Sequence, residues 1–281
     1  MSGWGPRIVG VLAIVVALSP VVGAQWPSYP TPGVPRTPDG KPVLDGLAPR
    51  TPDGKVDFSG IWNRIGGGGR GRAGAPPPPT TTPDGIPLST FGEVAGRGFQ
   101  LPLQPWAAEL KKKRMADNNK DNPDVWCLPI GLMQYHNHGQ PRQIVQTKNL
   151  ILITYESNYG LRYIYMDGRP APSNDPTPWW FGYSRGWYEG DTLVVETTNF
   201  RGDERAGWLD VNGSPYTEAL KMTERFRRPN FGTLEIDVTI DDAKAYTKPF
   251  TVRVNQRLMV DSEMIEFICN ENEKSTDHLA K

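Results

Sequence analysis

The chain has 281 residues, and its 31 basic and 31 acidic side chains give a formal net charge of zero at pH 7. This balance gives no electrostatic reason to expect a nucleic acid or an anionic membrane surface as a partner. The 28 prolines and 30 glycines are concentrated before residue 105, which leaves regular sequence for about one domain.

Residues 1–24 are predicted to be a secretory signal peptide. Arg7 precedes an apolar run at residues 8–18, which is too short to span a bilayer comfortably. Small residues at 22–24 provide a cleavage site. The alternative is an uncleaved N-terminal anchor. Because no second long apolar run follows, we expect a periplasmic or secreted protein without membrane insertion after cleavage.

Residues 25–104 form a largely irregular segment that is rich in proline and glycine. The motif Thr-Pro-Asp-Gly occurs at residues 37–40, 51–54 and 82–85. Each copy predicts a β-turn led by proline, and the unequal spacing argues against a repeat architecture. Residues 56–63 are the exception, because they favour a short strand that docks Trp62 into the main domain.

The main domain is predicted to cover residues 105–273, followed by a short tail at 274–281. Residues 104–118 read as one helix, with Pro105 suited to its first turn. Beyond it, β-branched and aromatic residues dominate short runs that end at turn residues. The predicted strands are residues 143–147, 150–156, 161–166, 180–188, 191–198, 220–227, 232–240, 250–255 and 264–269.

The pattern within these strands predicts an all-β, mainly antiparallel fold. Residues 182–200 are the clearest hairpin, since Gly190 can adopt positive φ at its turn. Residues 150–153 are apolar throughout, so we expect them to be central in the sheet or covered on both faces. Short connections imply antiparallel neighbours, and the strand number fits a lipocalin-like up-and-down β-barrel or a two-sheet sandwich. A barrel of this size can hold one small ligand.

The chain has two cysteines, Cys127 and Cys269. An isolated pair in an exported protein predicts one disulfide, which would join the start of the folded region to its last strand. The alternative is two buried free thiols.

Several segments together resemble a family of secreted bacterial proteins that has no established activity. They are residues 57–62 (DFSGIW), 105–107 (PWA), 127–131 (CLPIG), 144–146 (IVQ), 167–169 (DGR), 187–195 (WYEGDTLVV), 223–226 (TERF) and 269–272 (CNEN). The resemblance implies a secreted or periplasmic protein with a mostly β domain. The chain departs from the family pattern at residues 134–139 (QYHNHG), and Tyr216 stands where the family has histidine.

One predicted strand carries candidate ligand-binding side chains on both faces. Tyr163, Tyr165 and Asp167 alternate onto one face, whereas Arg162 faces the other way. These residues suit a pocket with one charged group and aromatic walls, or a structural pair of arginine and carboxylate. The tryptophans nearby suit either ligand stacking or core packing. The complete candidate set is Arg162, Tyr163, Tyr165, Asp167, Trp180, Trp187, Trp208, Asp210 and Glu224.

His136 and His138 would share one face of a strand and could bind Zn²⁺ or Cu²⁺, but no third ligand is apparent. Histidines on a surface or loop are the alternative. The sequence has neither Gly-x-Ser-x-Gly nor His-Glu-x-x-His, and no cofactor is predicted. Several acids could act as general acid or base, but sequence does not reveal their separation or burial.

Three functions fit these patterns. The first is an exported β-barrel that binds a small apolar or aromatic ligand. The second is a cofactor-independent lyase, isomerase or hydrolase that uses carboxylates and tyrosine in the same cavity. The third is a cell-envelope interaction protein. Two carboxylates that converge in the cavity would favour the enzyme, whereas a single charged group would favour binding. A filled core with aromatic residues on an exposed patch would favour the interaction protein.

Overall fold

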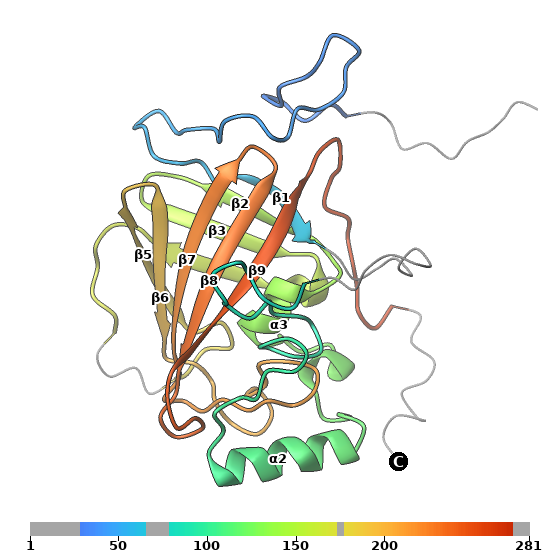
Figure 1. Ribbon diagram of the computed structural model, residues 1–281, viewed down its shortest axis with the longest axis vertical. Helices are drawn as coiled ribbons and strands as arrows, with labels where there is room; N and C mark the ends of the chain where they lie inside the picture. Colours follow the sequence, from blue (N-terminus) through green and yellow to red (C-terminus); the bar gives the residue numbers. More distant parts are fainter. Residues whose placement is uncertain (1–28, 66–78, 173–176, 272–281) are drawn as a thin grey trace, which may run out of the picture.

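The computed structural model describes residues 29–65, 79–172 and 177–271 (Figure 1). The predicted signal peptide and the C-terminal tail at 274–281 lie outside these ranges. None of the helices formed by the described residues is both long enough and apolar enough to cross a bilayer.

Nine strands close into one β-barrel, which confirms the predicted all-β fold and identifies it as a barrel rather than a sandwich. The strands are β1 (Gly60–Arg64), β2 (Arg142–Gln146), β3 (Leu150–Tyr155), β4 (Leu161–Tyr165), β5 (Tyr183–Glu189), β6 (Thr192–Thr198), β7 (Lys221–Asn230), β8 (Thr233–Asp241) and β9 (Phe250–Met259). Neighbours are antiparallel except β4 and β5, which run parallel and share two residue pairs.

Alternation along each strand sets the inner and outer faces of the barrel. In β8, Leu234, Ile236 and Ile240 are fully buried while Glu235 points outward. Residues 150–153 are central rather than covered on both faces, because β3 pairs with β2 on one side and with β4 on the other. In β3 Ile151 and Ile153 are buried, whereas the alternate leucines are partly exposed.

β1 closes the barrel, because it pairs with β2 on one side and with β9 on the other. Its Trp62 is fully buried, and the indole N–H donates to the Phe58 carbonyl at 2.9 Å. A strand from the proline-rich front segment therefore completes the sheet, and the nine described strands leave no edge open.

The three Thr-Pro-Asp-Gly motifs form the same turn, as predicted. In each, the glycine N–H donates to the threonine carbonyl at 2.8–2.9 Å, and the glycine has a φ of +80° to +84°. Two turns are tied to the barrel by ion pairs: Arg36 binds Asp261, and Arg50 binds Asp191 in the β5–β6 turn. These turns lie at one end of the barrel (Figure 1).

The other end of the barrel is covered by α2 (Pro105–Ala116), α3 (Leu132–Asn137) and the loop that precedes β7 (Figure 1). The predicted helix at 104–118 corresponds to α2. The expectation of a strand at His136 and His138 is wrong, because His136 belongs to α3 and His138 follows its last residue. All six residues of α3 are buried, so this short helix acts as a plug.

The predicted disulfide joins Cys127 to Cys269. Residues 264–269 are not a strand, however, so the bond attaches the segment after β9 rather than the last strand itself. Cys127 directly follows a 3-10 helix, Pro123–Trp126, that lies near α2.

We expect reduction of this disulfide to lower the free energy of unfolding by about 3–5 kcal/mol, because the bond closes a long loop. The two cysteines are 142 residues apart in the sequence. Urea unfolding with and without reductant measures the difference, and the double variant Cys127→Ser, Cys269→Ser should match the reduced protein. Equal unfolding curves with and without reductant would contradict the expectation.

Candidate functional site

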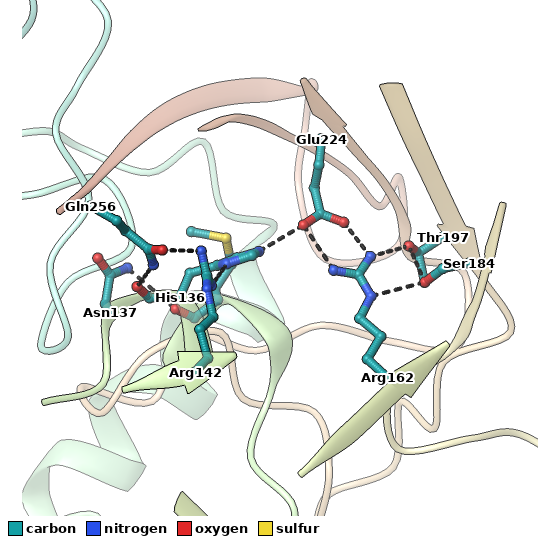
Figure 2. Close-up of polar contacts among 9 residues, drawn as sticks. His136, Asn137, Arg142, Arg162, Ser184, Thr197, Glu224 and Gln256 are labelled. Carbon is teal, nitrogen blue, oxygen red and sulfur yellow. Dashed lines mark hydrogen bonds and ion pairs between the residues drawn. The ribbon is translucent and has the colours of Figure 1, made fainter. Parts of the chain in front are cut away.

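A chain of buried polar side chains crosses the barrel interior (Figure 2). Arg162 of β4, Glu224 of β7, His136 of α3 and Arg142 of β2 follow one another through direct contacts. Each is at most 2% exposed. Arg142, Arg162 and Glu224 occupy inward positions that apolar residues fill elsewhere in the same strands.

Arg162 and Glu224 form a two-pronged ion pair. Nη1 of Arg162 donates to Oε1 of Glu224 at 3.0 Å, and Nη2 donates to Oε2. The guanidinium also donates to the hydroxyls of Ser184 and Thr197, at 3.0 and 2.8 Å. The buried Arg162 guanidinium is thus held in one orientation by a carboxylate and two hydroxyls.

His136 lies between Glu224 and Arg142. Its Nε2 is 2.7 Å from Oε1 of Glu224, while Arg142 contacts Nδ1. Arginine can only donate, so Nδ1 accepts and the proton resides on Nε2, which donates to the carboxylate. Burial and the nearby Arg142 charge lower the pKa of His136 to about 4, although Glu224 acts in the opposite direction. The imidazole is therefore neutral at pH 7.

The carboxyl group of Glu224 is ionised. Burial alone would raise its pKa, but the Arg162 charge and the hydrogen bonds from His136 and Arg162 lower the pKa to about 2. Glu224 therefore supplies one negative charge to the interior.

Arg142 has no carboxylate partner among the described residues. It donates to His136 and to the side-chain carbonyl of Gln256, and both are neutral. Burial lowers the pKa of Arg142 to about 10, which still leaves it protonated at pH 7. Two guanidiniums and one carboxylate leave the network with one surplus positive charge.

Several unpartnered polar atoms belong to α3, to β2 and β3 or to the connection between β3 and β4. Within the described ranges, nine buried side-chain atoms lack a hydrogen-bond partner, and five of them lie in or near the β2–β3–β4 corner. They are Nε of Arg142, the hydroxyls of Tyr135, Tyr155 and Ser157, and Oδ1 of Asn158. Arg142 and Tyr155 are directly opposite one another on β2 and β3. Buried atoms without a partner call for an explanation, and a polar guest would supply the missing hydrogen bonds.

Aromatic rings stand next to these atoms. The Tyr135 ring centroid is 4.3 Å from that of Tyr155 and 5.3 Å from that of Phe181. Gly160 allows this packing, because a Cβ there would lie 2.9 Å from Tyr155 and 3.0 Å from Tyr135. The corner therefore combines a surplus guanidinium, buried tyrosine hydroxyls and flat apolar faces.

The structure brings only Arg162 and Glu224 of the predicted candidates together in this interior. Tyr163 is 47% exposed on the outer face of β4. Asp167 pairs with Arg169, whose guanidinium lies 4.0 Å above the Tyr165 ring outside the barrel. These three side chains do not meet Arg162.

The remaining four candidates are dispersed. Trp180 packs under Arg201, and Trp187 is half-exposed on β5. Trp208 and Asp210 are buried in the loop before β7, where Asp210 accepts hydrogen bonds from the Val94 N–H and from Ser214. Asp210 therefore organises a loop and does not face the interior network.

The metal hypothesis for the two histidines finds no support in the structure. His136 binds Glu224 inside the barrel, while Nε2 of His138 is 3.6 Å from Asp124 near the disulfide. No cluster of three or more metal-binding side chains occurs in the described part of the chain.

Sequence reasoning missed His136, Arg142, Tyr155 and Gln256 as members of one site. A signal was present for Arg142, because it alternates with Ile144 on the inward face of β2. An arginine at an inward strand position requires a partner.

No protein-family model, no curated protein and no solved structure matches the chain. The resemblance to secreted bacterial proteins therefore stays a prediction, and the site must be interpreted from its own geometry.

His136 makes folding stability depend on pH. The unfolded histidine binds a proton near pH 6.5, but the folded one only near pH 4. The free energy of unfolding should therefore have its highest value above pH 6.5. It should fall as the pH drops towards 4, by about 3 kcal/mol at most. Urea unfolding of the wild type and of His136→Gln measures this, because glutamine keeps one donor and one acceptor. The same loss in both proteins would exclude His136 as the cause.

Glu224→Gln should destabilise the fold by about 3–5 kcal/mol, because it leaves two buried guanidiniums without a counter-charge. Glu196→Gln is the matched control, since Glu196 on β6 forms its ion pairs with Arg185 and Lys221 at the surface. The control should cost about 1 kcal/mol or less. Thermal and urea unfolding compare the two, and equal effects would contradict a special role for the interior pair.

Proposed function

We propose that the protein binds a small aromatic or apolar ligand that carries one anionic group. The ligand is held at the α3 end of the barrel interior, in the corner between β2, β3 and β4. The observation that carries this proposal is the buried Arg142, which has no carboxylate partner in the described chain.

The charge balance supports an anionic ligand. A buried guanidinium without a counter-ion is unfavourable, because its desolvation is not offset by Coulomb attraction. One carboxylate of a ligand would neutralise the surplus charge. The unpartnered Nε of Arg142 and the Tyr155 hydroxyl would each donate to it.

The aromatic rings support a flat, apolar body for the same ligand. Tyr135, Tyr155 and Phe181 pack against one another with their centroids 4.3–6.2 Å apart. The hollows beside α2 and beside β5 lie outside this corner. Because the three rings pack against one another, binding requires them to part, and partly buried Phe181 is the ring best able to move.

The arrangement of acids favours binding over the alternative of an acid–base enzyme. A single carboxylate, Glu224, is part of the interior network, and its low pKa leaves it a poor proton acceptor at neutral pH. Both ring nitrogens of His136 are already engaged. The disulfide supports the prediction that the protein works in an oxidising compartment such as the periplasm.

Isothermal titration with benzoate and with its neutral analogue benzamide tests the proposal. Benzoate should bind, benzamide should bind at least about tenfold more weakly, and Arg142→Gln should remove that preference. Arg228→Gln is the matched control, because Arg228 is also buried without a carboxylate partner but lies beside Trp62 and Phe231 and bonds to backbone carbonyls.

The control should lose stability yet keep its preference for benzoate. If benzoate and other aromatic carboxylates do not bind the wild type, or if Arg228→Gln abolishes binding as fully as Arg142→Gln does, the proposal fails.

A further inference from the structure

A hollow of about 400 Å³ lies on the outside of the barrel, between α2 and the loops that cover the same end. We name it the α2 hollow. Its walls come from α2, from the segment up to Trp126 and from the loop that contains Trp208. Its volume falls in the range of small-ligand sites. It shares no lining residue with the interior network, so it is a separate site.

Arg114 and Trp208 contribute a rigid part of the lining. The Arg114 guanidinium carbon is 3.9 Å from the Trp208 ring centroid, and the guanidinium donates to the carbonyls of Glu204, Gly207 and Gly213. Arg114 forms no ion pair within the described ranges. It therefore fixes the loop and places a positive charge in the lining of the hollow.

Charged side chains of both signs surround the hollow. The cations are Lys113, Arg114, Lys120 and Arg205, and the acids are Asp117, Asp121 and Glu204. None of these seven forms a side-chain ion pair with another described residue. Four cations and three acids leave a surplus of one positive charge. The hollow therefore offers hydrogen-bond donors and acceptors side by side, with a net preference for a monoanion.

Trp126 adds an accessible aromatic face. The residue is 41% exposed, and its indole N–H donates to the Lys120 carbonyl at 3.1 Å, which fixes the ring beside the charged groups. Trp126 also precedes Cys127 of the disulfide, so its backbone is held in place. An exposed indole fixed in this way can stack against a flat apolar face.

We infer that the α2 hollow binds a small acidic sugar of one or two rings, such as a uronic acid. A sugar ring presents an apolar C–H face to the Trp126 indole. Its hydroxyls donate to Asp117, Asp121 or Glu204 and accept from the lysines, while its carboxylate balances the surplus positive charge. An aromatic hydrocarbon could contact Trp126 but would form no hydrogen bond or ion pair with the charged side chains of the lining. A nucleotide would bring two or more negative charges close to three acids.

Calorimetric titration with D-glucuronate, D-glucose and adenosine monophosphate tests this inference. D-Glucuronate should bind at least about tenfold more tightly than the other two, and the affinity should fall as salt is added. Trp126→Ala should weaken the binding by about tenfold, and Trp126→Phe by less, because phenylalanine keeps an aromatic face.

Trp187→Ala is the matched control, since Trp187 has a similar exposure of 43% on the barrel wall. It should leave glucuronate binding unchanged, and Trp126→Ala should leave benzoate binding unchanged. The inference is wrong if glucuronate does not bind, if adenosine monophosphate binds more tightly, or if Trp187→Ala has the same effect as Trp126→Ala. A loss of benzoate binding alone would contradict only the proposal for the interior site.

Discussion

An arginine enclosed in a β-barrel without a counter-charge is the constraint on which the account of this molecule depends. The Arg162–Glu224 pair is balanced and could be purely structural. Arg142 is different, because its partners His136 and Gln256 are neutral. Neutral His136 accepts a hydrogen bond from Arg142 and donates one to Glu224, so it connects Arg142 to the Arg162–Glu224 pair. Burial of such a charge costs desolvation free energy, which another favourable interaction must offset. A bound anion is the simplest interaction of this kind.

Much of the fold could be predicted from the alternation of apolar and polar residues and from composition. In β8 apolar residues alternate with polar ones, so its inward face could be predicted from residue type, whereas in β7 the inward positions include Glu224 and Arg228. Closure through β1 was harder to foresee, because a strand of five residues pairs with partners about 80 and 195 residues away. α3 was missed for a related reason. Its six residues include no start signal, and burial in the barrel end overrides their weak helical preference.

The site was less predictable than the fold, for a physical reason. Arg162 and Glu224 could be singled out as charged residues within apolar strands. That they contact each other depends on the strand order and curvature of the barrel, because β5 and β6 separate β4 from β7 in the sheet. His136 joins them from α3, and no local pattern links that helix to β7. Tyr163 and Tyr165 shared a strand with Arg162, but the pleat turned them outward.

The surplus interior charge can be tested most directly by native mass spectrometry of the protein purified from its own compartment under mild conditions. The account predicts that the wild type retains a small anionic molecule, released on unfolding, and that Arg142→Gln does not, whereas Arg228→Gln still does. A wild-type mass equal to that of the bare chain, together with no gain in stability from any aromatic carboxylate, would contradict it.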